Sequence, residues 1–201
     1  MLRTLREIFR PVRVDSAPAF REFVAGESAL MAQKTATGYC RAKTLVFSHA
    51  LFAEAAFIEA LARCRWEAFA AVLGDVLVIS EGLLRPHAAT ASRTLAAPLA
   101  DLFDAILADH PRPTHRPQGW GDVERAFRQR IAESAAGELP DAAQVARHSA
   151  RRLNDVLPIH TNYRAIDEGV IEASIMFQMV ALSDKMRRRY DAPAVARALG
   201  G

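Results

Sequence analysis

The stretch from Phe47 to Leu84 constrains the fold more than any other part of the chain. It is apolar almost throughout, and no proline interrupts it before Pro86. Acidic residues nevertheless recur along it, at Glu54, Glu59, Glu67, Asp75 and Glu81. A β-strand rarely exceeds about ten residues, and a membrane span rarely carries so many carboxylates. The stretch therefore predicts one or two long helices at the centre of a helical domain.

Composition extends the helical prediction to most of the chain. Of the 201 residues, 51% are hydrophobic, which is enough for a sizeable core in one domain. Alanine and arginine, both good helix formers, are abundant. No alternating strand pattern interrupts the helical periodicity. We therefore expect an all-α protein, a single bundle of about five to seven helices around a long central apolar helix.

Prolines and changes of charge divide the chain into three parts. Residues 1–13 predict a short amphipathic basic helix, and residues 14–190 predict the helical bundle domain. Within the bundle, residues 109–120 contain three prolines and predict an extended connector. Residues 191–201 predict a C-terminal tail with room for one more helical turn.

Local signals place the last helices of the bundle. Asp141 followed by Gln144 predicts a capping box, in which the aspartate side chain accepts from a backbone amide of the first helical turn. A strong final helix is expected from about Arg164 to Tyr190. Its apolar residues are Ile166, Val170, Ile175, Met176, Met179, Val180 and Leu182.

Motifs for the common catalytic chemistries are missing from the sequence. It contains no GxGxxG, P-loop, GxSxG, HExxH or CxxC pattern. A carboxylate-bridged metal bundle needs glutamates followed three residues later by histidine, and no glutamate here has one. Cys40 and Cys64 are interpreted as buried free thiols. We therefore expect no metal and no cofactor, and favour a protein without catalytic activity.

The most site-like stretch of the first half surrounds Glu27, Lys34 and Tyr39. Glu27 and Lys34 are two helical turns apart, and Met31 lies between them on the same side. If this face packs inward, the charges need partners, because an unpaired buried charge is costly. A buried polar cluster can mark a functional site, so these three residues are candidate ligand-binding residues. The alternative interpretation is that the face is partly exposed.

Two other polar patterns have simpler interpretations. Glu59, Arg63 and Glu67 recur at four-residue intervals, which predicts an exposed ladder of ion pairs on one helix face. His110 and His115 flank the proline-rich connector and are expected in a solvated loop rather than at a metal.

Arginines form two groups in the second half of the chain, besides those of the N-terminal segment, although the formal net charge is only +3. Each of two groups could neutralise a few phosphates of a nucleic acid. Few aromatic residues accompany them, so stacking on single strands is not expected. The candidate nucleic-acid-binding residues are Arg147, Arg151, Arg152, Arg187, Arg188 and Arg189.

The N-terminal segment combines an apolar stripe with arginines. The stripe consists of Leu2, Leu5, Ile8 and Phe9, and it could pack on the domain, on a partner or on an anionic membrane surface. Arginines interrupt every apolar run near the N-terminus, so no secretory signal is expected. No window of about 18 residues lacks charge, so no membrane span is expected. The expected location is the cytoplasm, with a peripheral position at a membrane as an option.

These observations favour one function and leave two alternatives open. The leading hypothesis is a non-enzymatic helical interaction or assembly protein whose partner is another protein. The first alternative is a helical nucleic-acid-binding regulator. The second is a ligand-binding or enzymatic bundle with its polar site near Glu27 and Lys34.

Overall fold

A computed structural model describes residues 13–44, 52–88 and 95–200. It is 81% helical, with seven α-helices and no β-strand in these ranges, which confirms the predicted all-α bundle. The helices are α2 (Ala17–Thr44), α4 (Ala55–Leu84), α5 (Ala96–Ala108), α6 (Gly121–Ala136), α7 (Ala142–Val156), α8 (Thr161–Arg189) and α9 (Ala192–Gly200). A short 3₁₀ turn, Arg85–His87, follows α4.

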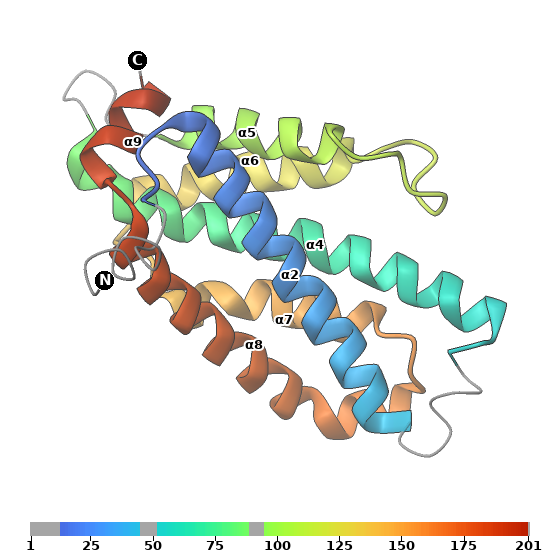
Figure 1. Cartoon of the computed structure of the whole chain (residues 1–201). Coiled ribbons are helices and arrows are strands. Elements are labelled where there is room, and N and C mark those ends of the chain that lie inside the picture. Colours follow the sequence, from blue (N-terminus) through green and yellow to red (C-terminus); the bar gives the residue numbers. More distant parts are fainter. Residues whose placement is uncertain (1–12, 45–51, 89–94, 201) are drawn as a thin grey trace, which may run out of the picture.

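Helix α4 is the centre of the bundle, as its apolar sequence predicts. Every residue from Glu67 to Gly82 is buried. All six other described helices contact α4, and Figure 1 shows it running through the middle of the molecule. Leu61 and Phe69, eight residues apart on one face of α4, are both buried. The stretch from Glu67 to Gly82 therefore has no solvated face, so its carboxylates must find partners inside the protein.

Most helix ends follow the local signals. Asp141 accepts a hydrogen bond from the backbone amide of Gln144 at 2.9 Å, which confirms the predicted cap of α7. Pro98 lies in the first turn of α5 and does not kink it. Helix α6 begins at Gly121, and its N-cap residue Trp120 makes no side-chain capping hydrogen bond. The stretch after residue 191, expected to hold a single turn, forms all of α9.

Backbone hydrogen bonds join the two ends of the described chain. The amide of Val14 donates to the carbonyl of Arg189 at 2.9 Å, and the amide of Asp191 donates to the carbonyl of Val14 at 2.8 Å. The predicted amphipathic helix lies outside the described residues apart from Arg13. The expected contacts of Leu2, Leu5, Ile8 and Phe9 therefore stay predictions. Among the described helices, none has the length and hydrophobicity that crossing a membrane requires.

Candidate functional site

Three carboxylates are buried on α4: Glu67, Asp75 and Glu81. A buried carboxylate is costly unless cations and hydrogen-bond donors surround it. Arginines from several elements meet this need. Glu81 pairs with Arg85 one turn later, through Nη2 to Oε2 at 2.6 Å. Arg85 also donates to the carbonyls of Ser134 and Gly137, both at 2.8 Å, so it ties the end of α4 to the end of α6.

Glu67 is the most heavily paired of the three acids and is only 4% exposed. Arg116 donates from Nε to Oε1 at 2.6 Å and from Nη2 to Oε2 at 3.0 Å. Arg152 on α7 donates from Nη2 to Oε2 at 2.5 Å, and Nε2 of His115 lies 2.9 Å from Oε1. The predicted exposed ladder of Glu59, Arg63 and Glu67 is therefore wrong for Glu67, because partners distant in sequence enclose it.

The proline-rich loop of residues 109–120 brings two of these partners to α4. Pro113 and Trp120 are buried, and the Arg116 guanidinium lies 4.4 Å from the centre of the Trp120 ring. Nη1 of Arg116 also donates to Asp122 at 2.8 Å. The predicted extended connector is thus a loop that packs on the central helix, with His115 pointing inward rather than into solvent.

The pKa values of Glu67 and Asp75 shift in opposite directions. Burial alone would raise the pKa of Glu67, but hydrogen bonds from Arg116 and Arg152 outweigh it and lower the pKa to about 2. Asp75 is fully buried, and burial raises its pKa to about 6 although Arg130 and Ser149 oppose the shift. Arg130 Nη2 lies 2.6 Å from Oδ1 of Asp75, and the Ser149 amide donates to Oδ2 at 3.1 Å.

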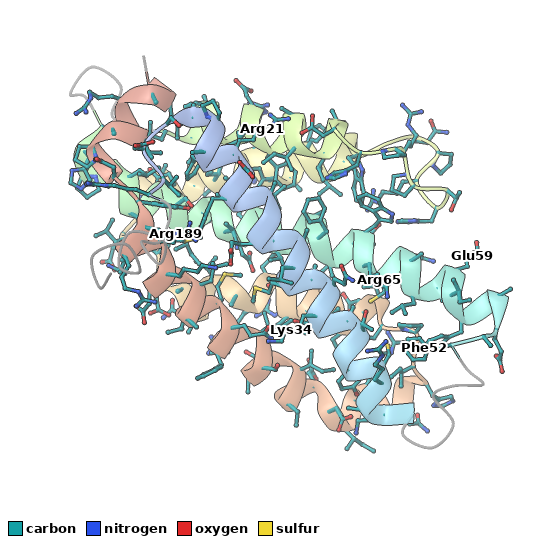
Figure 2. All side chains as sticks on the ribbon, viewed as in Figure 1. Arg21, Lys34, Phe52, Glu59, Arg65 and Arg189 are labelled. Atoms are coloured by element: carbon teal, nitrogen blue, oxygen red, sulfur yellow. The ribbon has the colours of Figure 1, made fainter. Side chains whose placement is uncertain are left out.

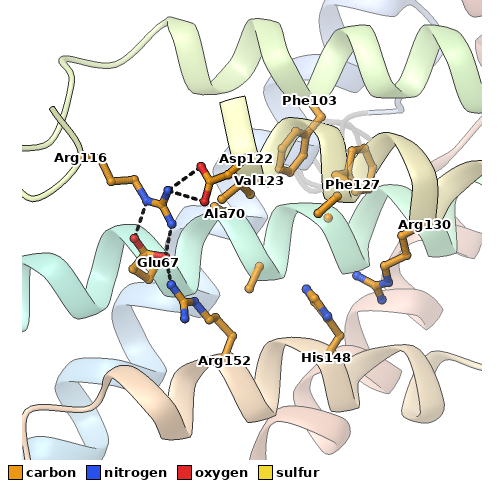
Figure 3. A pocket seen from close by; sticks show the side chains of 13 residues that line it. Glu67, Ala70, Phe103, Arg116, Asp122, Val123, Phe127, Arg130, His148 and Arg152 are labelled. Carbon is orange, nitrogen blue, oxygen red and sulfur yellow. Dashed lines mark hydrogen bonds and ion pairs between the residues drawn. The ribbon is translucent and has the colours of Figure 1, made fainter. Parts of the chain in front are cut away.

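A cavity of about 290 Å³ lies between α6 and α7, over α4 (Figure 3). Both helices pack on α4 but make little contact with each other, and small residues form the floor: Ala70, Ala71 and Gly74. One wall is apolar and includes Phe103 and Phe127, whose rings stack with centres 4.2 Å apart. Arg116, Arg130, His148 and Arg152 also line it.

The cationic end of this cavity keeps a neutral histidine. His148 is exposed on α7 and stands between Arg130 and Arg152, as Figure 3 shows. Desolvation, together with the charges of Arg130, Arg151 and Arg152, lowers the pKa of His148 to about 4. The positive charges around the imidazole therefore favour its neutral form. The sequence does not predict this cluster, because Arg116 in the loop and Arg130 on α6 approach His148 and Arg152 of α7 only in the folded chain.

The outer face of α8 carries a second candidate site. We call it the α8 stripe, and it consists of Ile166, Val170, Ala173, Phe177 and Val180. The exposed fractions are 77% for Ile166, 65% for Val170, 77% for Phe177 and 42% for Val180. Ala173 is also exposed. The opposite face of the helix buries Ile171, Ile175, Met179 and Leu182. Helix α8 therefore has two apolar faces, and within the described residues only one of them packs on the bundle.

The structure separates Glu27 from Lys34. Glu27 accepts from Nζ of Lys185 on α8 at 2.6 Å, whereas Lys34 is exposed midway along α2 (Figure 2). Tyr39 donates to Oδ2 of Asp167 at 2.6 Å. The first and third of these residues therefore hold α2 against α8. Their proposed role in ligand binding stays a prediction.

The candidate nucleic-acid-binding arginines have different environments. Arg147 is exposed and pairs with Glu172 at 3.2 Å, and Arg152 pairs with Glu67. Arg151 is exposed on α7. Arg187 and Arg188 are exposed at the end of α8, while the Arg189 guanidinium lies 5.4 Å from the centre of the Phe23 ring. Acidic partners thus offset part of the positive charge that a phosphate backbone would meet.

Comparison of the chain with known proteins gives no relative from which a role for these sites could be inferred. No family model, no curated protein and no solved structure matches the chain. Within the described residues, no group of three or more histidine, cysteine or acidic side chains is placed to hold a metal ion. Cys40 and Cys64 are buried, as expected.

Proposed function

We propose that the protein is a non-enzymatic helical assembly protein and that the α8 stripe is its binding surface. The exposure of the stripe carries this proposal. Single exposed apolar residues are common on protein surfaces, but contiguous exposed patches mark interaction sites. Here Ile166, Val170 and Phe177 are each exposed by more than half, and they follow one line along α8.

The spacing of the stripe favours a helix as the partner. Its residues are separated by four, three, four and three positions, from Ile166 to Val180. This is the spacing of a seam that packs against a second helix, with side chains of each helix filling holes in the other. Its exposed neighbours include three small residues, namely Gly169, Ser174 and Ala181, so a partner helix can approach closely.

The charge pattern favours a second copy of the chain as that partner. Neither the stripe nor its small neighbours carry charge. A partner with a charged face would lose hydration without gaining a compensating group. Another uncharged stripe is the matching surface, and a second molecule provides one. The net charge of only +3 opposes such self-association weakly.

Charges at the end of the stripe favour an antiparallel pair. Asp184, Arg187 and Arg188 are exposed just beyond Val180. A parallel pair would place each of them beside its own copy, and like charges repel. An antiparallel pair centred on Ala173 places Asp184 beside the first turn of the other α8. The helix dipole favours a negative charge there. In this register Phe177 faces Gly169, so a large side chain meets a small one.

Sedimentation equilibrium tests the proposal. We expect the wild-type protein to show a reversible monomer–dimer equilibrium. Phe177→Asp should weaken it by about 30-fold or more, since a charge replaces a central apolar contact. Leu30→Asp is the matched control, because Leu30 is also exposed on a long helix, by 62%, but lies on α2. It should leave the dimerisation constant unchanged.

Other outcomes distinguish other occupants of the stripe. A wild-type protein that stays monomeric at high concentration contradicts assembly with a second copy. If the monomer then sediments with anionic vesicles and Phe177→Asp does not, the stripe is a membrane-contact surface instead. If the wild-type protein and Phe177→Asp sediment with the vesicles to the same extent, the stripe contacts neither a second copy nor the membrane.

A further inference from the structure

We propose that the cavity between α6 and α7 binds a small oxyanion, a carboxylate or phosphate, that is attached to an apolar group. Two arginines, Arg130 and Arg152, line it together with the imidazole of His148, and its apolar wall combines Phe103 and Phe127. The inference is independent of the α8 stripe, which lies on a different helix and faces away from the bundle.

Unused donors at the cationic end support an anionic ligand. Arg152 uses Nη2 for Glu67, and Arg130 uses Nη2 for Asp75 and the Val145 carbonyl. Within the described part of the chain, the hydrogen bonds and ion pairs of both arginines use Nη2 and leave Nε and Nη1 unused. An arginine presents five N–H donors in a planar fork that suits carboxylate and phosphate oxygens. The two side chains flank His148, whose imidazole can donate one further hydrogen bond to an oxyanion beside either arginine.

The acids around the cavity do not oppose this assignment. Glu67 and Asp122 are both bound to Arg116, and Asp75 is bound to Arg130. Each of these carboxylates is therefore already paired with an arginine. A cationic ligand would have to displace one of these pairs, whereas an anion meets donors that are free.

The apolar wall defines the rest of the ligand. The stacked rings of Phe103 and Phe127 stand across from the small floor residues, and Val123 lies beside them. The volume of about 290 Å³ is at the lower limit of small-molecule sites, about 300 Å³. The site therefore fits one compact apolar group, such as a single ring, next to one oxyanion.

Nuclear magnetic resonance of the His148 ring protons tests the proposal in the full-length protein. The probes are phenyl phosphate, inorganic phosphate and phenol at millimolar concentrations. Phenyl phosphate should shift the His148 signal saturably, and each of the other two should bind at least about tenfold more weakly. Absence of a saturable shift with phenyl phosphate would overturn the proposal. Equal binding of inorganic phosphate would overturn the apolar half of it.

Variants in which an uncharged amide replaces a charged side chain separate binding from folding. Arg152→Gln removes one free donor set while Arg116 and His115 still hold Glu67. The double variant Arg130→Gln with Asp75→Asn removes a buried pair together, which proteins often tolerate. Each should weaken phenyl phosphate binding about tenfold or more, while both keep a cooperative thermal transition. Arg125→Gln, an exposed position on α6 away from the cavity lining, should bind as the wild type. Undiminished binding in Arg152→Gln and the double variant contradicts the assignment.

Discussion

Arg116 donates two hydrogen bonds to Glu67, at 2.6 and 3.0 Å, across 49 residues of sequence. Together with His115, this contact holds the loop of residues 109–120 on the central helix. The same guanidinium packs on Trp120 and reaches Asp122, so it also positions the start of α6. The cavity between α6 and α7 therefore depends on how a buried acid of α4 is neutralised.

Removing Arg116 should destabilise the fold. Arg116→Ala leaves Glu67 buried with Arg152 and His115 as its remaining partners, and breaking a buried ion pair costs about 3–5 kcal/mol. We expect the free energy of unfolding, measured by urea denaturation, to fall by an amount at the lower end of this range. Arg112→Ala, at an exposed position of the same loop, should change stability by less than about 0.5 kcal/mol. Similar losses in both variants would mean that the loop, not the ion pair, is responsible.

Glu67 should make stability depend on pH in the acid range. Its pKa is lowered from 4.5 to about 2 in the folded protein. Above pH 4.5 its stabilisation is fully present, and it is lost as pH falls from 4.5 to about 2, because the unfolded chain takes up the proton first. The difference in unfolding free energy between wild type and Glu67→Gln should therefore shrink over this interval. A constant difference would contradict the lowered pKa.

A pair of glycines should respond to alanine in opposite directions. A Cβ on Gly82 would lie 2.5 Å from Cδ of Pro140, so Gly82→Ala forces α4 and the α6–α7 connection apart. Overpacking of this kind costs about 1–3 kcal/mol. Gly26 lies on α2, and a Cβ added there would meet no atom within 4 Å, so Gly26→Ala should stabilise the helix by up to about 1 kcal/mol. Thermal unfolding of the two variants measures both effects.

The apolar face of α4 should be sensitive to truncation. Leu61→Ala and Phe69→Ala each leave a cavity in the core and should cost about 2–5 kcal/mol. Ile58→Ala on the same helix is the control, because Ile58 is 51% exposed. Ile58→Ala should lower the free energy of unfolding by much less than either substitution of a buried residue. Equal losses at all three positions would contradict the orientation of α4.

The sequence predicts the elements better than it predicts the sites. The proline-free apolar run identifies α4, and Asp141 with Gln144 identifies the start of α7, because both signals act over a few residues. Glu67 gives no such signal, since its partners at 115, 116 and 152 approach only when the chain is folded. Its four-residue spacing from Arg63 points instead to a surface pair that does not form.

The two faces of α8 show a second limit. Ile166, Val170 and Val180 are as apolar as Ile175 and Met179, so composition does not distinguish the buried face from the exposed one. The seam spacing of the α8 stripe is visible in the sequence. Only the position of α7, α4 and α2 on the other side of the helix shows that the described chain leaves this seam uncovered.

Disulfide formation at the α8 stripe tests self-assembly most directly. Cys40 and Cys64 are buried, and burial raises the pKa of their thiols to about 11 and about 12, so the wild-type protein should give no cross-link. Ala173→Cys should form a covalent dimer under mild oxidation, whereas Ala29→Cys, exposed on α2, should not.

The orientation follows from two further cysteines. Val180→Cys alone should remain monomeric, and a mixture of Val180→Cys with Ile166→Cys should form the mixed dimer. Efficient cross-linking of Val180→Cys alone would contradict the antiparallel pair. Failure of Ala173→Cys to cross-link above the level of Ala29→Cys would contradict assembly through α8.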